Sequence, residues 1–541
     1  ITSLSIFRRK LLTLIPGQEI HLTIFRDGKT FEITSTLARK KPRKKTQQNQ
    51  PPEISLGLHF RESHSILPSY CKNQLTKQTV FFMTPDINPQ IFREYDIRGV
   101  VGKDLTPETV QLIGQAIGTY LKRQGAKSLV LGWDVRSSSV DFRNILSKAL
   151  TSTGCDVVDI GMVPTPVSYF ALHHLKADGG VMITGSHNPP EFNGFKISQD
   201  QHSLYGKKIQ ELKSLIDSKD FETGSGKIEQ TNILEPYMEH ICSILNISRK
   251  VKVVVDGGNG CFGIVGPQLL RKLGLDPIEI FCEPDGTFPN HHPDPTVAKN
   301  LKGLIAKVRA ENAELGIGFD GDADRIGIVD NNGNILWGDQ LLTIFARDIL
   351  SRNPGATIVG EVKCSQNLFQ DIEKHGGVPV MAPAGHSLIK NKMKETGALL
   401  GGEMSGHVCF ADNYFGYDDA VFAAGRILQI VAQSSQKVSE MLADLPETAY
   451  TPEIRIDCPD NRKFEIVREL TEFFRNHYQV IDIDGVRINF GDGWALIRAS
   501  NTQPVLVLRF EAETQTRLEE LVSIVKKQMD QYRPIVQFDH C

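Results

Sequence analysis

The chain has 541 residues, which at a typical domain size is enough for about three to five domains and a large buried core. Its 61 lysine and arginine residues against 64 acidic ones give a net charge of -3, so the chain as a whole is not the polycation that binds nucleic acid. No apolar stretch reaches the roughly 18 residues of a membrane span, so we expect neither nucleic-acid nor membrane partners.

Nine cysteines are scattered along the chain without C-x-x-C spacing, at positions 71, 155, 242, 261, 282, 364, 409, 458 and 541. Their odd number and wide spacing argue against a disulfide framework and against a zinc site built from cysteines. Because free thiols persist in a reducing compartment, the sequence predicts a soluble, cytoplasmic protein.

The first 82 residues differ in composition from the rest, and we expect them to form an appended segment. The stretch PGQEIHLTIFRDGKTFEITSTLARK, residues 16–40, alternates apolar and polar residues around Asp27-Gly28, which predicts a β-hairpin. On this pattern residues 1–40 resemble the C-terminal half of a PDZ domain. They do so without the earlier strand and the carboxylate-binding loop that grip a peptide.

The stretch after this hairpin is basic, polar and punctuated by proline. RKKPRKKTQQNQPP, residues 39–52, carries six basic residues, which indicates a solvated linker rather than a nucleic-acid or lipid contact. We predict a disordered linker over residues 41–82. Composition becomes globular at Met83, which is therefore a candidate for the initiator.

Three segments after Met83 follow one pattern, namely KSLVLGWDVRSSS (127–139), KVKVVVDGGNGCFG (250–263) and ATIVGEVKCSQNL (356–368). Each runs from an apolar strand into a polar or glycine-rich loop and then into a helical stretch. Continuous apolar strands suit sheets that are covered on both faces. We therefore predict three related α/β domains with mixed sheets.

The C-terminal part of the chain breaks this pattern. VIDIDGVRINFGDGWALIRASNTQPVLVLRFEAET (480–514) predicts four short strands joined by Asp-Gly turns. The amphipathic stretch TQTRLEELVSIVKKQMDQY (514–532) predicts a helix, so this part reads as a smaller α+β domain. We predict domain boundaries at 83–231, 232–334, 335–446 and 447–541.

The stretch ITGSHNPPEFNGFK, residues 183–196, places Ser186 and His187 directly after an apolar run that ends at Ile183. Backbone N–H groups of such a Gly- and Asn-rich turn can hold an anion, to which His187 and Lys196 add positive charge. An ordinary polar turn is the alternative. Taken alone, this stretch predicts only a candidate nucleophile.

The stretch GFDGDADRIGIVD, residues 318–330, supplies three carboxylates at alternate positions, Asp320, Asp322 and Asp324. In an extended segment they would point the same way and could bind a hard cation through oxygen. A calcium-binding EF-hand loop is disfavoured, because Arg325 and Asn331 stand where that loop needs Gly and Glu. Magnesium is the better prediction, with Arg325 as a second contact for an anion; a solvated acidic turn is the alternative.

Two further stretches carry polar side chains that suit a sugar phosphate. In GGEMSGH (401–407), Glu403 and Ser405 share a side, and a glutamate can accept from two vicinal sugar hydroxyls. RASNTQPVLVLRFEAE (498–513) gathers donors that suit a phosphate: Arg498, Ser500, Asn501 and Thr502.

These four motifs, together with FREYDIRG (92–99) and GHSLIK (385–390), resemble the α-D-phosphohexomutases from Met83 to the end of the chain. Within that family they are most similar to the bacterial phosphomannomutase/phosphoglucomutase enzymes. The resemblance implies four domains around a central cleft and the reversible interconversion of hexose 1-phosphate and hexose 6-phosphate. It also implies a role in feeding the synthesis of GDP-mannose and UDP-glucose type sugar nucleotides.

The resemblance further implies residue roles, with Ser186 as a phosphoserine and Mg²⁺ and hexose 1,6-bisphosphate as cofactor and intermediate. The implied catalytic residues are Ser186, His187, Lys196, Arg325, Lys363 and His407. The implied substrate-binding residues are Tyr95, Arg98, His386, Glu403, Ser405, His407, Arg498, Ser500, Asn501 and Thr502. The implied metal ligands are Ser186, Asp320, Asp322 and Asp324. The identity of the proton carrier stays open, and we expect a monomer whose partners are small hexose phosphates.

Three alternative functions remain open. A phosphoglucosamine mutase would share the scaffold, although relatives of that type carry GEQSGH where this chain has Met404. A metal-dependent phosphomonoesterase could use HHPDP (291–295), but those histidines lack companion ligands at metal spacing and are expected to be structural. A peptide-binding scaffold built on the N-terminal hairpin would explain none of the four motifs.

Overall fold

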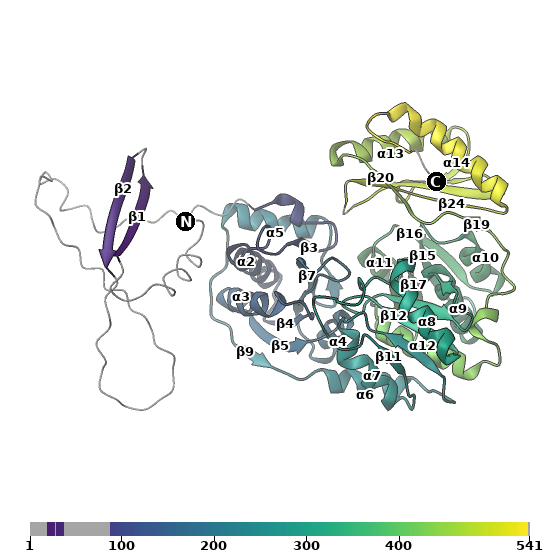
Figure 1. The fold of residues 1–541 in the computed structure, drawn as a ribbon, viewed down its shortest axis with the longest axis horizontal. Coiled ribbons are helices and arrows are strands. Elements are labelled where there is room, and N and C mark those ends of the chain that lie inside the picture. Colours follow the sequence, from purple (N-terminus) through teal and green to yellow (C-terminus); the bar gives the residue numbers. More distant parts are fainter. Residues whose placement is uncertain (1–18, 27–28, 37–86, 502, 539–541) are drawn as a thin grey trace, which may run out of the picture. The chain divides into compact units, whose positions relative to one another are not determined.

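A computed structural model describes residues 19–26, 29–36, 87–501 and 503–538 of the chain (Figure 1). The chain divides into two compact units, Ile1–Thr84 and Pro85–Cys541. In the first unit, β1 (Glu19–Arg26) pairs antiparallel with β2 (Lys29–Thr36), and Arg26 lies opposite Lys29. The predicted hairpin is therefore confirmed, while its two turn residues and the predicted linker lie outside the described residues.

The second unit begins with a largely parallel sheet in the order β3-β7-β6-β4-β5-β9, with β8 beside β7. β6, β4, β5 and β9 run parallel, whereas β7 runs antiparallel to both β3 and β6. Its strands are β3 (Ile97–Val100), β4 (Ser128–Trp133), β5 (Asp156–Met162), β6 (Gly179–Ile183), β7 (Phe192–Gln199), β8 (His202–Ser203) and β9 (Ile228–Gln230). Its helices are η1 (Pro89–Ile91), α2 (Pro107–Arg123), α3 (Ser139–Ser152), α4 (Thr165–His174) and α5 (Lys207–Ser218).

The second and third sheets are smaller and, like the first, combine parallel with antiparallel strand pairs. The second has the order β11-β10-β12-β13-β14 and the third the order β16-β15-β17-β18. The second comprises β10 (Val253–Asp256), β11 (Ile278–Ile280), β12 (Leu315–Phe319), β13 (Ile326–Asp330), β14 (Ile335–Leu336), α6 (Leu234–Ile244), α7 (Phe262–Lys272), η2 (Ala298–Leu301) and α8 (Lys302–Glu311). The third comprises β15 (Thr357–Glu361), β16 (Val378–Ala382), β17 (Leu400–Gly402), β18 (Val408–Phe410), α9 (Gly338–Arg352), α10 (Gln366–Lys374), α11 (His386–Thr396), α12 (Ala420–Gln433) and η3 (Val438–Glu440).

These three sheets share one connection that matters for function. In each, the chain leaves a parallel strand, makes a short loop and returns antiparallel beside it: β6 to β7, β12 to β13 and β17 to β18. The three predicted strand-to-helix segments are confirmed as β4 with α3, β10 with α7 and β15 with α10. Three related mixed α/β domains are therefore present, as predicted.

The fourth domain is an antiparallel sheet in the order β19-β24-β23-β22-β21, with β20 also pairing with β24. Its elements are β19 (Ala449–Tyr450), β20 (Ile454–Asp457), β21 (Gln479–Ile481), β22 (Val486–Asn489), β23 (Gly493–Ala499), β24 (Val505–Ala512), α13 (Asp460–Arg475), α14 (Gln515–Met529) and η4 (Asp530–Tyr532). The predicted strands and C-terminal helix are confirmed, and α13 is an additional helix. Both helices pack their apolar sides on the sheet, which gives the predicted α+β fold.

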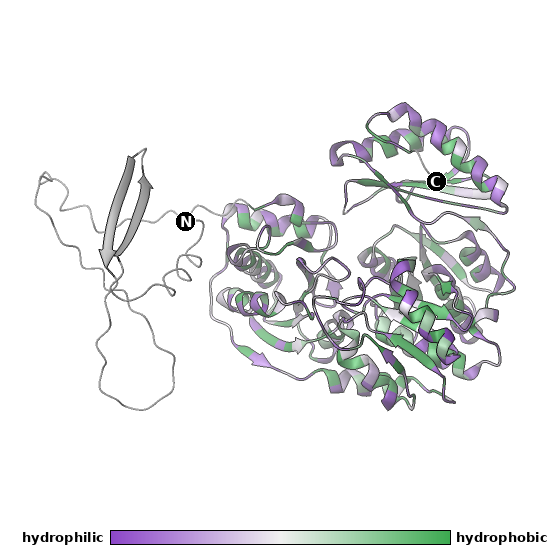
Figure 2. Ribbon diagram, in the orientation of Figure 1, coloured by the Kyte–Doolittle hydropathy of each residue, from purple (hydrophilic) through white to green (hydrophobic). Residues whose placement is uncertain are grey.

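The distribution of apolar side chains separates the fourth domain from the others. One hydrophobic cluster runs continuously through the first three domains, whereas the fourth has a core of its own. In Figure 2 the strands are mostly hydrophobic and the helices alternate between hydrophobic and hydrophilic residues, as expected for amphipathic helices that cover a sheet. Within the described residues no helix combines the length and apolarity needed to cross a bilayer.

Candidate active site

The candidate site is built from the three equivalent loops between a parallel strand and its antiparallel return. Ser186 lies in the loop between β6 and β7, the three aspartates lie between β12 and β13, and Glu403 and Ser405 lie between β17 and β18. The fourth domain adds the turn between β23 and β24, which holds Ser500 and Asn501. Sequence motifs that are far apart in the chain therefore occupy one kind of topological position.

Ser186 is buried and its hydroxyl faces the aspartate loop. Its Oγ donates to Asp320 Oδ2 at 2.9 Å and lies 3.1 Å from His187 Nδ1. The backbone at Ser186 has φ of 44°, in the left-handed region that residues other than glycine seldom adopt. A strained backbone at a nucleophile is typical of functional sites, because the surrounding structure must hold it in place.

Asp134 and Arg136, just after β4, hold the serine loop in this conformation. Asp134 Oδ2 accepts from the Gly185 N–H at 2.9 Å, and Arg136 Nη2 donates to the Ser186 carbonyl at 2.8 Å. Arg136 Nη1 also donates to the Phe192 carbonyl at 2.9 Å. The sequence motifs predict no role for this pair, although its position after an apolar parallel strand, in WDVR, is a usable signal.

The three aspartates are fully buried in a tight turn, so the expectation of an extended segment is wrong. Ala323 has φ of 58° and its N–H donates to the Asp320 carbonyl at 3.1 Å. This turn, rather than strand alternation, brings together carboxylate oxygens of Asp320, Asp322 and Asp324 that lie within 4.8 Å of one another.

The second-domain turn also packs directly on the serine loop. A Cβ on Gly321 would lie 2.4 Å from the Ser186 carbonyl oxygen, so only glycine fits at this point. Asp322 Oδ2 accepts from Thr165 Oγ1 at 2.6 Å and from Thr184 Oγ1 at 3.1 Å. The first and second domains are thus fastened together beside Ser186.

The donor atoms at this turn fit a hard divalent cation such as Mg²⁺. Among the described residues, Asp322 Oδ1 and Asp324 Oδ1 are buried and have no hydrogen-bond partner. Burial and the neighbouring carboxylates of Asp322 and Asp324 raise the pKa of Asp320 well above its usual range. A cation bound by these oxygens would satisfy the two unpartnered atoms and offset the repulsion, and it would use only oxygen ligands, as Mg²⁺ prefers.

Positive groups surround the aspartates and the serine. Lys196 Nζ lies 2.8 Å from Asp322 Oδ2 and also contacts Asp324. Burial opposes its charge, yet these two carboxylates raise the pKa of Lys196 well above its usual value. Burial, with Arg325 and Arg98 nearby, lowers the pKa of His187 well below its usual value.

His407 connects the aspartate turn to the third domain. Its Nε2 accepts from Arg325 Nε at 2.9 Å, and its Nδ1 lies 3.0 Å from Asp418 Oδ2. His386 stacks on it with ring centroids 5.0 Å apart, and its own Nδ1 also lies 3.0 Å from Asp418 Oδ2. The carboxylate of Asp418, for which the sequence motifs predict no role, therefore contacts two predicted site histidines.

Glu403 points into the region where the first, third and fourth domains meet. Its Oε1 accepts from the Gly385 N–H at 2.7 Å, and its own N–H donates to the His407 carbonyl at 2.9 Å. Gly385 has φ of 135°, and a Cβ there would lie 2.5 Å from the Tyr95 ring. Ser405 is half-buried in the same turn.

Tyr95 joins these domains through one hydroxyl. It donates to the Ala384 carbonyl at 2.8 Å and accepts from Asn501 Nδ2 at 2.9 Å. Arg498 is buried beside this turn, and its Nε donates to Asp484 Oδ2 at 2.9 Å. The same carboxylate oxygen accepts from the Ala384 N–H at 3.0 Å, so the fourth-domain turn contacts the third domain.

The other predicted site residues have contacts of their own. Arg98 is buried in the first domain, where it donates to Asn188 Oδ1 at 2.8 Å and contacts Asp96 and the Gly185 carbonyl. Lys363 Nζ lies 3.1 Å from Glu453 Oε2. Ser500 Oγ accepts from the Gln503 N–H at 3.2 Å, and Thr502 lies outside the described residues.

Comparison with known protein families assigns all four domains. Four family domains match in chain order: the phosphoglucomutase/phosphomannomutase alpha/beta/alpha domains I (residues 89–223), II (235–333) and III (337–449), and the C-terminal domain (453–528). The chain belongs to the phosphoglucomutase/phosphomannomutase family. The resemblance stated from the motifs is thereby confirmed.

Individual relatives of this chain agree with the family assignment. A phosphomannomutase/phosphoglucomutase of Pseudomonas aeruginosa is 48% identical over 446 residues, covering 82% of this chain and 96% of the relative. A phosphoglucomutase of Neisseria meningitidis is 43% identical over 441 residues, covering 81% of this chain and 96% of the relative. A solved structure of a family protein from Burkholderia thailandensis has a TM-score of 0.78 and 40% identity, covering 83% and 99% of the two chains.

His291 and His292 are the candidate metal ligands of the phosphomonoesterase alternative. They lie elsewhere in the second domain. His291 Nε2 lies 3.1 Å from Asp256 Oδ1, and its Nδ1 contacts the His292 carbonyl at 2.9 Å. Within the described residues, neither belongs to a group of convergent metal-binding side chains. Their expected structural role agrees with these contacts.

Proposed function

We propose that the chain is a phosphomannomutase with phosphoglucomutase activity, which interconverts hexose 1-phosphate and hexose 6-phosphate. Ser186 would carry the phosphoryl group, and hexose 1,6-bisphosphate would be the intermediate and activator. The names of the relatives at 43% to 48% identity support this activity. The products would feed the synthesis of nucleotide sugars of the GDP-mannose and UDP-glucose type.

The observation that carries the proposal is the contact between Ser186 and the aspartate turn. A buried serine hydroxyl lies 2.9 Å from Asp320 Oδ2, beside two carboxylate oxygens that have no partner among the described residues. A phosphoserine carries about two negative charges, so a cation must offset them before a sugar hydroxyl can attack. When bound by Asp320, Asp322, Asp324 and the serine phosphate, Mg²⁺ would supply that offset.

The side chains around Ser186 would stabilise and orient the transferred group. Lys196 and Arg325 carry positive charge at the aspartate turn, and His187 stands beside the serine oxygen. In the first half-reaction, the bond between Ser186 Oγ and phosphorus breaks as the sugar hydroxyl oxygen forms its own bond to phosphorus. His407 Nε2 can accept the hydroxyl proton once the sugar displaces Arg325 Nε from it.

The second half-reaction needs the sugar to present its other phosphate to the same serine. The bisphosphate would turn around, so that the unprotonated Ser186 Oγ forms a bond to the phosphorus that the fourth domain had held. The bond from that phosphorus to the sugar oxygen breaks, and the proton held on His407 passes to the freed oxygen. Glu403 and Ser405 would hold the sugar hydroxyls, and Arg498, Ser500, Asn501 and Thr502 would hold the phosphate that is not reacting. Tyr95, Arg98, Lys363 and His386 would border the bound substrate.

The assay that tests this proposal follows hexose 6-phosphate formation and free phosphate release in the same reaction. A mutase converts hexose 1-phosphate to 6-phosphate without releasing phosphate in proportion, whereas a phosphomonoesterase releases phosphate. Release of phosphate alone would reject the proposal. Turnover of glucosamine 1-phosphate in preference to mannose and glucose 1-phosphates would favour the phosphoglucosamine mutase instead.

We expect mannose 1-phosphate and glucose 1-phosphate to be used within about tenfold in kcat/KM, which corresponds to about 1.4 kcal/mol. The two sugars differ only at C2, whereas Glu403 and Ser405 would bind the 3- and 4-hydroxyls and the phosphate contacts are indifferent to C2. N-acetylglucosamine 1-phosphate should be used less well, because Met404 offers no amide to a C2 nitrogen. Parallel initial-rate measurements on the three sugars check this order.

We also propose that the enzyme works as a monomer in the cytoplasm. All seven cysteines in the described residues are free thiols, which suits a reducing compartment. The four domain boundaries predicted from the sequence are likewise proposed here. The mass in solution, measured by light scattering at working concentration, tests the monomer.

A further inference from the structure

A second cluster of metal-binding side chains lies in the third domain, beside the aspartate turn. His386 begins α11, His407 immediately precedes β18, and Asp418 lies two residues before α12. The ligand atoms of these three residues lie within 4.8 Å of one another. His407 is 4% exposed and Asp418 is fully buried, so the cluster is part of the interior.

The atoms that face one another in this cluster lack hydrogen-bond partners among the described residues. These atoms are His386 Nδ1, His407 Nδ1 and Asp418 Oδ2, and Asp324 Oδ1 from the aspartate turn is unpartnered as well. Both histidine nitrogens lie 3.0 Å from Asp418 Oδ2, at ion-pair distance. Three of these buried polar atoms, on His386, His407 and Asp418, thus converge on one point, where a bound ion would contact all three.

The distances fit a tetrahedral metal ion. Ligands bonded to Zn²⁺ at about 2.1 Å in a tetrahedron lie about 3.4 Å from one another. The two distances to Asp418 Oδ2 are 3.0 Å, and Asp324 Oδ1 lies 3.6 Å from His407 Nδ1. Small side-chain movements would therefore bring the two imidazole nitrogens and the Asp418 oxygen to bonding distance of a common ion, while Asp324 Oδ1 stays with the aspartate turn.

Cations already contact the second polar atom of Asp418, of Asp324 and of His407. Lys390 Nζ donates to Asp418 Oδ1 at 2.8 Å, and Lys196 contacts Asp324 Oδ2. His407 Nε2 accepts from Arg325 Nε, a contact that an ion on Nδ1 would break, because the neutral ring would then carry its proton on Nε2.

We propose that His386, His407 and Asp418 form a second metal site, selective for a nitrogen-seeking divalent transition ion of the Zn²⁺ class. Two imidazoles and a carboxylate suit Zn²⁺, whereas Mg²⁺ prefers the all-oxygen set of the aspartate turn. An ion at this site blocks the acceptor atom of His407 and separates it from Arg325. This inhibitory consequence rests on the proposed mutase function, whereas binding of the ion does not.

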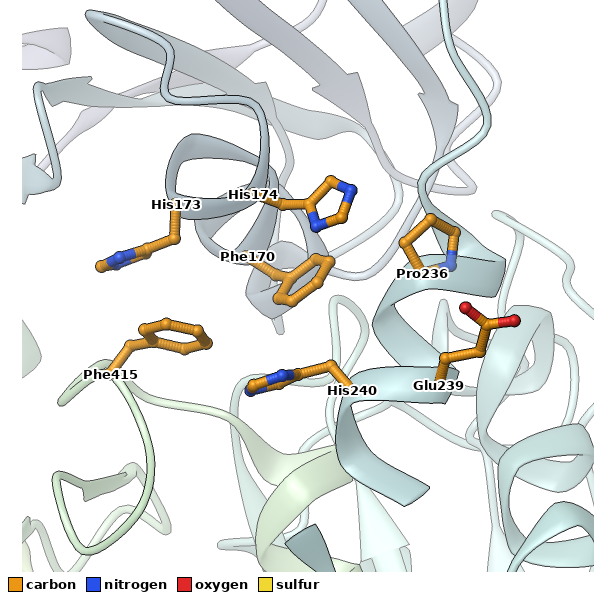
Figure 3. Close-up of a pocket in the computed structure, with 7 residues that line it drawn as sticks. All are labelled: Phe170, His173, His174, Pro236, Glu239, His240 and Phe415. Atoms are coloured by element: carbon orange, nitrogen blue, oxygen red, sulfur yellow. The ribbon is translucent and has the colours of Figure 1, made fainter. Parts of the chain in front are cut away.

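A histidine-rich pocket elsewhere in the protein lacks this arrangement. A cavity of about 300 Å³ is lined by Phe170, His173, His174, Pro236, Glu239, His240 and Phe415 (Figure 3). His173 and His174 point to opposite sides of Phe170, and none of the three imidazoles belongs to a convergent group among the described residues. This pocket supplies a control for adventitious binding of zinc to histidine.

The test uses the full chain, stripped of metal and then kept in millimolar Mg²⁺. Equilibrium dialysis against Zn²⁺ measures the ions bound per chain and their affinity, and Co²⁺ serves as a probe whose visible absorption is strong in tetrahedral sites with nitrogen ligands. We expect one ion to bind in excess Mg²⁺ with a tetrahedral Co²⁺ spectrum. In the mutase assay, the same Zn²⁺ concentration range should inhibit.

Three variants locate the ion. His386→Gln removes one ligand and should weaken binding at least tenfold, in line with the about 10- to 100-fold losses seen when support of a metal ligand is removed. Lys390→Met removes the cation that competes for Asp418 and should tighten binding. His240→Gln alters only the pocket of Figure 3 and should leave affinity and stoichiometry unchanged. Melting temperatures establish that each variant is folded, and Asp418→Asn is measured beside them as a second change of a proposed ligand that should also weaken binding.

Two results would overturn the site. One is unchanged zinc affinity in both His386→Gln and Asp418→Asn, which would place the ion elsewhere. The other is loss of the ion in Asp320→Asn together with its retention in His386→Gln, which would place Zn²⁺ at the aspartate turn. Absence of mutase activity in the unmodified protein would reject the proposed function while leaving the dialysis result intact.

Discussion

The two halves of the candidate site are built differently. We call the serine loop with the aspartate turn the transfer half, and the Glu403 turn with the Arg498–Asn501 turn the recognition half. In the transfer half, Ser186 and the three aspartates are buried and fastened to each other by side-chain and backbone contacts between two domains that share one hydrophobic cluster. The recognition half instead depends on a fourth domain with a separate core.

This contrast separates two tasks. Phosphoryl transfer depends on groups that are already placed where charge develops, and such preorganisation needs a rigid surrounding. Binding a sugar that must leave, turn and bind again needs a partner that can release it, which a separately folded domain can provide. Substitutions in the transfer half should therefore lower turnover, and those in the recognition half should weaken binding.

The largest expected effect is that of Ser186→Ala. Removing the phosphoryl carrier should lower kcat by about a thousandfold or more, because no other group in the transfer half can replace the serine oxygen. Binding of hexose phosphate, measured by calorimetry, should persist because the recognition half is unchanged. Ser147→Ala, a buried serine on α3 whose hydroxyl lies 3.4 Å from a backbone carbonyl, is the control and should keep full activity. Turnover in freshly prepared Ser186→Ala would contradict the assignment, provided that other nucleophiles are excluded.

Removal of divalent metal should have the next largest effect. Exhaustive treatment with EDTA should lower the rate to near background, because the charges of the phosphoserine and the three aspartates would no longer be offset. Adding Mg²⁺ back should restore the rate, whereas the melting temperature should change far less than the activity. Activity that survives complete chelation would show that the three-aspartate assignment is wrong.

Arg498→Ala tests the recognition half. The loss of charge-assisted hydrogen bonds of about 1.5–3 kcal/mol should raise KM roughly 10- to 100-fold, with kcat changed only a few-fold. The matched control is Arg475→Ala, since Arg475 is a half-exposed arginine of the same domain that pairs with Asp482. If Arg498→Ala lowers kcat and leaves KM unchanged, the recognition half contributes to turnover rather than to binding, and the proposed separation of roles is wrong.

The smallest expected effect is that of removing the N-terminal unit. A chain that starts at Met83 should be as active as the full chain, because every residue assigned a role lies at Tyr95 or later and the second compact unit begins at Pro85. Thermal melts and mutase assays of the two chains make the comparison. A clear drop in melting temperature or activity of the shorter chain would show that the N-terminal unit belongs to the working enzyme.

The sequence was most informative where one residue type carries its own chemistry. Ser186, Asp320, Asp322 and Asp324 are predicted as site residues because a serine in a glycine-rich turn and three nearby carboxylates suggest function without a fold. The strand-to-helix rhythm likewise identified the α/β domains. The reasoning about the aspartates was wrong in its geometry, since a turn with Ala323 at positive φ gathers them rather than an extended strand.

Residues that act by holding others were missed. Asp134 binds the Gly185 N–H across 51 positions, and Asp484 binds the Ala384 N–H across 100 positions. Such contacts follow from the tertiary arrangement, and a single aspartate in a loop gives no local sign of its partner. Asp418 could have been noticed in YDDA before α12, but only the fold shows that it lies between two histidines.

The hydroxyl of Tyr95 has a consequence for the order in which the enzyme becomes competent. Its hydrogen bond with Asn501 joins residues that are 406 positions apart, so the two cannot meet until nearly the whole chain has left the ribosome. Domains fold largely in the order of synthesis, and the first two domains alone already contain Ser186 and the aspartate turn. A nascent chain can therefore bring Ser186 and its three aspartates together before the third domain supplies His407 and before the fourth can bind a sugar phosphate, so selectivity is the last property the enzyme acquires.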